Sequence, residues 1–138
     1  MIIPAVTVIV TLTLVRCKCE MKFSSVYKCA VSPTGDKLYI TNHWQHKLVT
    51  LARDGTPLEC LVDRQFGQLD GIHVTPAGQV LVCADWAHLI IQVDSDGKKT
   101  LMTEKRGWSP ESACYHSETT SIIVGQWNNN NILVLKVQ

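Results

Sequence analysis

The chain of 138 residues has the length of one domain, and its 46% apolar and 18% charged content excludes an intrinsically disordered protein. Its formal net charge is +1 with the two signs interleaved, which excludes a bulk electrostatic attraction to nucleic acid or membrane but leaves room for a local patch. Function must therefore be sought in local groups of residues.

The N-terminal segment is apolar and is followed by two cysteines. Ile2–Val15 is shorter than the roughly 20 residues that span a bilayer. No basic residue precedes it, and Cys17-Lys18-Cys19 does not resemble a signal-peptide cleavage site. Thr7–Val15 is rich in β-branched residues, which favours a strand. A signal or anchor segment is the alternative, and the sequence leaves both open.

Three segments repeat one pattern with a period near 40 residues, and they are Ala30–Gly55, Ile72–Gly97 and Ala113–Leu135. Tryptophans recur in them at spacings of 42 and 41 residues, at Trp44, Trp86 and Trp127. Such a period, with several short strands in each unit, is typical of a β-propeller, whose sheets are called blades.

The second unit predicts four strands: Gly71–Val74, Val80–Cys83, Leu89–Val93 and a short outer strand, Thr100–Met102. Pro76 and Gly78 supply the first turn, because proline restricts φ and glycine accepts positive φ. Asp96-Gly97 is a strong hairpin signal. We expect the second strands of the three units to pair antiparallel with the segments before them, and these strands are Lys37–Thr41, Val80–Cys83 and Ser121–Gly125. No stretch has a sustained helical period, so the sequence predicts an all-β fold.

The expected architecture is a partial β-propeller of about three four-stranded antiparallel blades. The blades are assigned to residues 27–63, 69–104 and 110–138, and residues 1–26 to an N-terminal strand segment or the end of a preceding blade. The last blade lacks its outer strand, because only Ile132–Val137 follows its second strand. A closed propeller usually has four to eight blades, so we expect a fragment of a longer protein or a truncated gene product.

The pattern G-I-x-V-T-P-x-G-x-V-L-V-x-x-D of residues 71–85, followed by a third strand that opens with His88-Leu89, resembles the NHL repeat, which is named for Asn-His-Leu. Lys47-Leu48 and Asn131-Ile132 stand at the same place in the other units, so the match is diverged. The final unit, S-I-I-V-G-Q-W-N-N-N-N-I-L-V-L, is similar to the C-terminal region of molluscan tripartite-motif-like proteins. The resemblance covers Tyr27–Gln138 and implies a propeller that binds protein or single-stranded RNA. RING and B-box zinc patterns are absent from this sequence, so it does not imply ubiquitin-ligase activity.

The tryptophans follow the second strand of each unit, in loops that gather at one end of a propeller. Tryptophan offers a large contact area and one N–H donor, and it can stack on a base. The predicted binding face consists of Trp44, Trp86, Trp108, Trp127, His43, His46, His88, Arg64, Lys105 and Arg106. Packing of the tryptophans between blades, with the charged loops as a solvated rim, is the alternative.

We therefore expect a non-enzymatic, cytoplasmic binding module without cofactor or metal. Its partner is a protein or single-stranded RNA rather than a membrane, and its open arcs are expected to self-associate. The alternative is a fragment of a calcium-dependent gluconolactonase-like propeller hydrolase, for which Asp70, Asp85 and Glu111 are the acidic candidates.

Six cysteines are present, and we expect all of them to be reduced thiols, because four lie in or beside apolar runs and disulfide frameworks belong mainly to small secreted domains. They are Cys17, Cys19, Cys29, Cys60, Cys83 and Cys114. The pairs His43-x-x-His46 and Cys17-x-Cys19 offer too few ligands to predict a zinc site.

Overall fold

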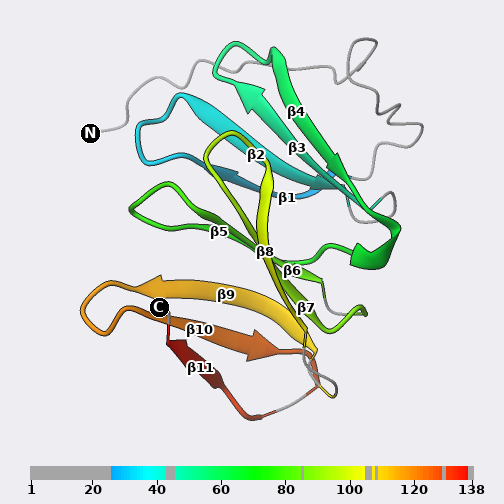
Figure 1. Cartoon of the computed structure of the whole chain (residues 1–138), viewed down its shortest axis with the longest axis vertical. Helices are drawn as coiled ribbons and strands as arrows, with labels where there is room; N and C mark the ends of the chain where they lie inside the picture. The colour runs from blue at the N-terminus through cyan, green and yellow to red at the C-terminus, as the bar shows by residue number, and fades with distance from the viewer. Residues whose placement is uncertain are drawn as a thin grey trace, which may run out of the picture.

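The computed structural model describes residues 26–42, 46–84, 86–104, 107, 109–128 and 130–136. They form three antiparallel sheets that stack as an arc (Figure 1). The first sheet contains β1 (Val26–Val31), β2 (Lys37–Asn42), β3 (Lys47–Ala52) and β4 (Pro57–Val62). The second contains β5 (Ile72–Val74), β6 (Val80–Ala84), β7 (Leu89–Val93) and β8 (Lys99–Glu104). The third contains β9 (Pro110–His116), β10 (Ser121–Gln126) and β11 (Leu133–Lys136).

This arrangement confirms the all-β partial propeller, with two four-stranded blades and a last blade of three strands. Within each blade the strands pair in chain order, as a meander. The three predicted second strands are found at their expected places, as β2, β6 and β10, each paired antiparallel with the strand before it. Residues 1–25, to which most of the expected N-terminal segment belongs, lie outside the described residues.

The sequence explains the turn of the first hairpin in each of the first two blades, β1–β2 and β5–β6. Gly35 and Gly78 have φ values of +75° and +87°, which side chains rarely tolerate. Their N–H groups donate to the carbonyl oxygens of Ser32 and Thr75 at 2.9 Å each. The Pro-x-Gly segments therefore direct the chain back along β1 and β5, as the sequence predicts.

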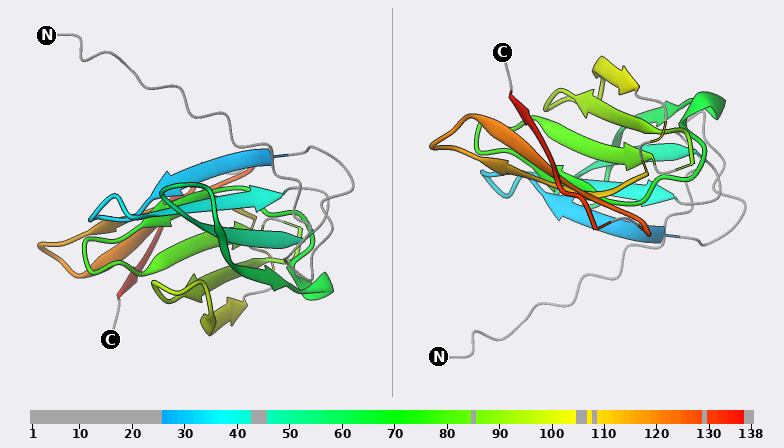
Figure 2. Two further views of the ribbon diagram at one scale, coloured as in Figure 1. Left: turned by 90° about the horizontal axis from the view of Figure 1, so that it is seen from above. Right: turned by 90° about the horizontal axis from the view of Figure 1, so that it is seen from below.

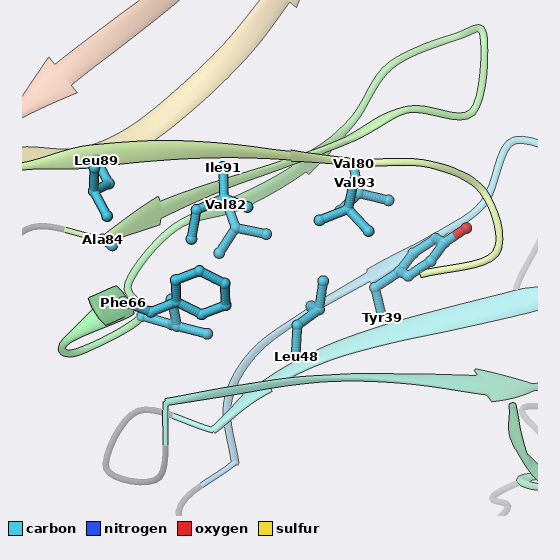
Figure 3. Packing of buried hydrophobic residues seen from close by; sticks show 10 residues of the cluster. Tyr39, Leu48, Phe66, Val80, Val82, Ala84, Leu89, Ile91 and Val93 are labelled. Carbon is cyan, nitrogen blue, oxygen red and sulfur yellow. The ribbon is translucent and has the colours of Figure 1, made fainter. Parts of the chain in front are cut away.

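The main core lies between the first and second blades (Figure 3). Tyr39 and Leu48 of the first blade face Val82 and Ile91 of the second, and all four are at most 1% exposed. Phe66, from the segment that links the two blades, is fully buried in the same cluster. Side chains alternate between the two faces of a strand, so β6 and β7 each contribute every second residue to this core.

The second blade is buried on both of its faces. Leu81 and Ile90 point away from the first blade and pack against Ile122 and Val124 of the third. Both faces of β6 and β7 are thus apolar, which explains their nearly continuous hydrophobic sequences, VLVCA and LIIQV. The arrangement of the three sheets is visible from above and below in Figure 2.

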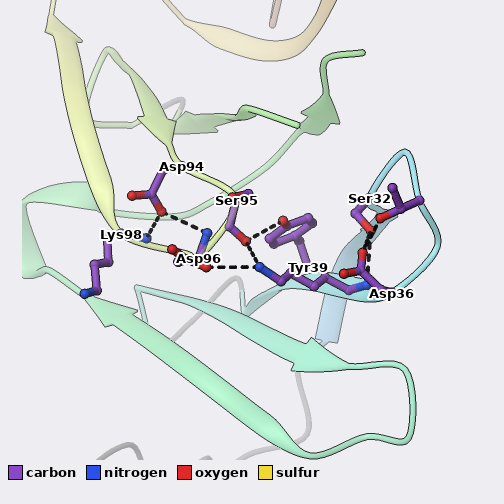
Figure 4. Close-up of polar contacts among 9 residues, drawn as sticks. Ser32, Asp36, Tyr39, Asp94, Ser95, Asp96 and Lys98 are labelled. Carbon is purple, nitrogen blue, oxygen red and sulfur yellow. Dashed lines mark hydrogen bonds and ion pairs between the residues drawn. The ribbon is translucent and has the colours of Figure 1, made fainter. Parts of the chain in front are cut away.

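A turn of the second blade is hydrogen-bonded to the first blade (Figure 4). The Ser95 carbonyl oxygen accepts hydrogen bonds from the Tyr39 hydroxyl and from Lys37 Nζ, at 2.9 Å each. Lys37 Nζ also lies 3.1 Å from the Asp96 carboxylate. The hydrogen-bonded Asp96 carboxylate raises the pKa of Lys37. Together the three contacts hold the β7–β8 turn against β2.

The two ends of the arc differ in exposure. On the last blade, Ile132 and Val134 are 68% and 61% exposed. On the first blade, the face turned away from the second is buried at Ile40, Val49 and Leu51. The outward face of the third blade is therefore open to solvent at Ile132 and Val134, whereas that of the first blade is covered at Ile40, Val49 and Leu51.

The cysteines correct one sequence-based expectation. Cys29, Cys83 and Cys114 are free thiols, but Cys60 is disulfide-bonded, so the expectation of six reduced thiols is wrong at Cys60. Cys29 and Cys114 are exposed, and they lie on the outer faces of the first and last blades instead of between blades. Cys17 and Cys19 lie outside the described residues.

Candidate binding face

The loops that follow the second strands and the segments that link the blades lie at one end of the arc, on the right of Figure 1. The hairpin turns β1–β2, β5–β6 and β9–β10 lie at the opposite end. We call the end with the blade-linking segments, on the right of Figure 1, the linker end. Of the ten residues predicted for the binding face, five are described by the structure, and they are His46, Arg64, Trp86, His88 and Trp127.

The two described tryptophans of this set are exposed. Trp86 is 73% exposed and Trp127 is 58% exposed, so neither packs in an inter-blade core. The backbone N–H of Trp127 donates to the Ser109 carbonyl oxygen at 2.8 Å, and this bond links the loop after β10 to the segment that precedes β9. The backbone of Trp127 is thus held while its ring remains accessible. Trp44 and Trp108 lie outside the described residues.

The two described histidines of this set lie at tight points of the loop backbone. His46 and His88 have φ values of +54° and +57°, the left-handed conformation that a tight loop requires here. The imidazole Nδ1 of His46 is hydrogen-bonded to the Gly67 carbonyl oxygen, and the His46 carbonyl oxygen accepts from the Asp63 N–H at 3.3 Å. His46 therefore joins the β2–β3 loop to the linker between the first two blades. His43 lies outside the described residues.

The same linker positions Arg64. The linker contains a short 3-10 helix, Arg64–Phe66. The Asp63 carboxylate caps this helix by accepting a hydrogen bond from the Gln65 backbone N–H at 2.9 Å. Phe66 is fully buried and anchors this turn, whereas Arg64 is exposed. At the end of the turn Gly67 lies against the next loop, since a Cβ on Gly67 would be 3.6 Å from Trp86 Cβ.

One supporting residue was not predicted from the sequence. Lys99 of β8 places its ammonium group 3.5 Å from the Asp63 carboxylate and 5.7 Å from the centre of the Phe66 ring. It thereby holds the segment that presents Arg64. No local motif marks Lys99, because its partners lie more than 30 residues earlier in the chain. Lys105 and Arg106, the other predicted basic residues, lie outside the described residues.

A second feature lies where the first strands of the three blades meet. A cavity of about 290 Å³ is lined by Lys28, Asp70, Gly71, Ile72, Glu111, Ser112 and Ala113, and we call it the axial pocket. It brings together Asp70 and Glu111, two of the three acidic candidates; the third, Asp85, lies outside the described residues. Among the described residues no group of three or more His, Cys, Asp or Glu side chains could hold a metal ion. Lys28, which also lines the pocket, was not predicted.

The comparisons with known proteins extend to the fold and no further. No protein-family model matches the chain, and no curated protein matches it. Among solved structures it is similar to the hydrazine synthase of Kuenenia stuttgartiensis, a protein that contains a β-propeller, with a TM-score of 0.73 and 19% sequence identity. The match covers 90% of this chain and 36% of that one. At this identity the likeness establishes a propeller-type fold and carries no information about activity. In the described part of the chain, no helix is long and apolar enough to cross a membrane.

Proposed function

We propose that the chain is a non-enzymatic binding module whose linker end recognises single-stranded RNA or a protein. The observation that carries this proposal is the exposure of Trp86 and Trp127 at that end, 73% and 58%. Tryptophan offers a large contact area and is enriched among the residues that dominate binding. Arg64 stands exposed on the neighbouring linker and supplies a cation for a phosphate or a carboxylate.

The test measures binding and stability on the same variants. The probe is a fluorescein-labelled single-stranded oligouridine of about 12 nucleotides, within the usual site sizes of such proteins. Trp86→Ala should weaken RNA binding by about 1–3 kcal/mol, the range for a lost stacking platform. Affinity should fall steeply with salt, because phosphate contacts release counterions. Leu58→Ala is the control, since Leu58 is an exposed apolar side chain on the outer strand β4.

The stability readout separates a binding role from a structural one. Because Trp86 is mostly exposed, Trp86→Ala should change the free energy of unfolding by no more than about 0.5 kcal/mol. If RNA binds weakly and without salt dependence, a cross-linked pull-down with wild-type and Trp86→Ala chains tests the protein partner. Equal RNA affinity and equal protein capture for the two chains would exclude the tryptophan face.

We further propose that this module belongs to an NHL-type, tripartite-motif-like protein of which the chain is a fragment. The support is the residue pattern of 71–85 and the propeller fold that carries it. Sequencing the transcript upstream of Met1 tests this: a RING or B-box reading frame supports it, and a signal peptide followed by further acidic channel residues contradicts it.

The cytoplasm remains the proposed compartment, and the cysteines test it. Three free thiols suit a reducing compartment, whereas the disulfide at Cys60 suits an oxidising one. Protein extracted from cells into an alkylating agent without reductant should carry the label on Cys60 if the chain is cytoplasmic. An unlabelled Cys60 would place it in an oxidising compartment.

Self-association is proposed through the open face of the last blade. Ile132 and Val134 are exposed there, next to a cavity of about 290 Å³ lined by Cys114, Ile123 and Ile132 among others. In addition, β11 pairs only with β10, so its other edge is unpaired among the described strands. Val134→Lys should convert a self-associating chain to a monomer in light scattering; a wild-type chain that is monomeric at tens of micromolar contradicts the proposal.

The hydrolase alternative has one observation in its favour, the presence of Asp70 and Glu111 in the axial pocket. A calcium-dependent lactonase needs oxygen ligands for its metal. Calcium binding that is lost in Glu111→Gln, together with hydrolysis of gluconolactone, would favour this alternative over the binding module.

A further inference from the structure

The outer face of the first blade, which is turned away from the second blade, is apolar at its centre. Antiparallel pairing places Cys29, Ile40, Val49 and Cys60 opposite one another, in a single row across β1, β2, β3 and β4. Residues directly opposite in neighbouring strands point to the same face of a sheet. Leu51 follows Val49 by two positions on β3 and therefore shares this face.

This face is buried, although the described apolar residues that pack there all belong to the first blade itself. Val49 is 0% exposed and Leu51 is 1% exposed. The outer face of the third blade shows what an uncovered sheet looks like: in its cross-strand row Cys114 and Val134 are exposed and Ile123 is partly exposed. A sheet face loses contact with water only when a second layer packs on it. The burial of the first blade therefore indicates a cover that comes from outside the described residues.

Cys60 indicates which part of the chain forms this cover. It is disulfide-bonded, whereas the other three described cysteines are free thiols. Since the chain contains six cysteines, only Cys17 and Cys19 remain as partners for Cys60 within the chain. Cys60 packs against the buried cluster of the outer face, so the disulfide lies beside the covered residues.

The N-terminal segment is long enough to reach this position. Val26 opens β1 and begins the cross-strand row that ends at Val62, two residues beyond Cys60 on β4. Three strand spacings and two residues along β4 amount to about 16 Å between Val26 and Cys60. Cys19 precedes Val26 by seven residues, which extend to about 23 Å. Either cysteine can therefore bond to Cys60.

We propose that residues 2–15 cover the outer face of the first blade, and that a disulfide from Cys60 to Cys17 or Cys19 holds them there. The segment is apolar throughout, as the cover of an apolar sheet must be. Its Leu12-Thr13-Leu14 stretch alternates as a strand does when only one of its faces is packed. The cover lies on the first blade and does not depend on the function proposed for the linker end.

Peptide mapping tests the disulfide. The full chain is equilibrated with oxidised and reduced glutathione, alkylated in denaturant and digested with trypsin without reductant. Trypsin separates the two candidate cysteines by cutting after Lys18. We expect peptide 54–64, which contains Cys60, to be linked to peptide 17–18 or to peptide 19–22. A free Cys60, or a bond from it to glutathione, to another cysteine or to a second copy of the chain, would overturn the proposal.

Methyl NOEs test the cover itself. In the oxidised chain, the methyl groups of Val49 and Leu51 should show NOEs to residues 2–15. Val31 is the matched control, because it lies on the same face of the sheet but is 54% exposed, and it should show none. A mixture of differently labelled chains identifies NOEs that arise between two copies. The absence of NOEs to residues 2–15, or NOEs only between copies, would show that this segment is not the cover.

Cysteine variants test whether the disulfide stabilises the blade. Cys60→Ser should lower the melting temperature by about 10 °C, because the unfolded chain is released from a closed loop of roughly 40 residues. Cys29→Ser is the matched control, since Cys29 lies in the same cross-strand row but is an exposed free thiol. It should melt like the wild type. Equal melting temperatures for the two oxidised variants would contradict a tether at Cys60.

Discussion

Replacement of Gly97 by alanine tests how the second blade packs on the first. Gly97 lies in the β7–β8 turn, is buried, and has a φ of +87°. A Cβ there would lie less than 3.0 Å from Thr50 Oγ1 and 3.1 Å from Glu59 Cβ, and both of these residues belong to the first blade. Gly97→Ala therefore adds a clash between blades to the strain of a positive φ.

The two contributions can be separated with Gly78. Gly78 has the same φ of +87°, but the nearest atom to its added Cβ is Ser95 Cβ at 3.9 Å. Gly78→Ala should cost about 1–2 kcal/mol, the strain alone. Gly97→Ala should cost about 1–3 kcal/mol more, the usual effect of overpacking a core. Urea unfolding with linear extrapolation measures both free energies.

Thr50 provides the matched rescue. Its hydroxyl is buried and has no hydrogen-bond partner among the described residues, so its removal breaks no bond. Thr50→Ala should recover most of the extra cost of Gly97→Ala, because it removes the atom that the new methyl group meets. Thr50→Val keeps the bulk and should not rescue. If Gly97→Ala costs no more than Gly78→Ala, or if both Thr50 variants rescue equally, the described contact between the blades is wrong.

Three further results are expected. Tyr39→Phe should lower the free energy of unfolding by about 1 kcal/mol, because the Ser95 carbonyl oxygen loses one of two donors; no change in urea unfolding would contradict the bond. Burial lowers the pKa of His73 below its ordinary value of 6.5, so the unfolded chain takes up the proton first. Stability should therefore fall as the pH drops from 6.5 through the folded-state pKa, and His73→Gln should remove that part of the pH dependence; an NMR titration with a pKa above 6.5 would refute this. In purified protein, Cys29 and Cys114 should be alkylated first, because they are exposed. Cys83 is buried and should react on unfolding, and Cys60 should react only after its disulfide is reduced.

The strands were predictable because their signals are local. Pro33 and Gly35, and Pro76 and Gly78, mark hairpin turns whose partners lie within a few residues. It was harder to predict which side chains of one blade face which side chains of the next. Aligning the blades on Trp86 and Trp127 equates Leu81 with Ile122, and would turn both away from the preceding blade.

In the structure these two residues face each other, because the third blade is shifted by one residue. Residues 75–79 separate the paired Val74 and Val80, whereas residues 116–121 separate the paired Tyr115 and Ile122, one residue more. A one-residue shift sends every side chain of a strand to the opposite face. Ile122 and Val124 are consequently buried against the second blade, and Ile123 is turned to the open face.

The candidate sites divide in the same way. The sequence alone identified the tryptophan loops, since the tryptophans recur with the period of the blades. It did not reveal that Phe66 and Lys99 hold the turn that presents Arg64. Nor did it indicate that Lys28 would join Asp70 and Glu111, which are 42 and 83 residues further along the chain, in one pocket.

The sequence by itself determined an all-β chain of repeated meander blades, because alternation, turn residues and a period near 40 act over short separations. The tertiary structure alone decided which face of the third blade is buried, that Trp86 and Trp127 are exposed, and that Cys60 is disulfide-bonded. The buried face of the third blade depends on contacts between blades, between residues that lie tens of positions apart. Such contacts follow from the packing of whole sheets and leave no signal in a local pattern.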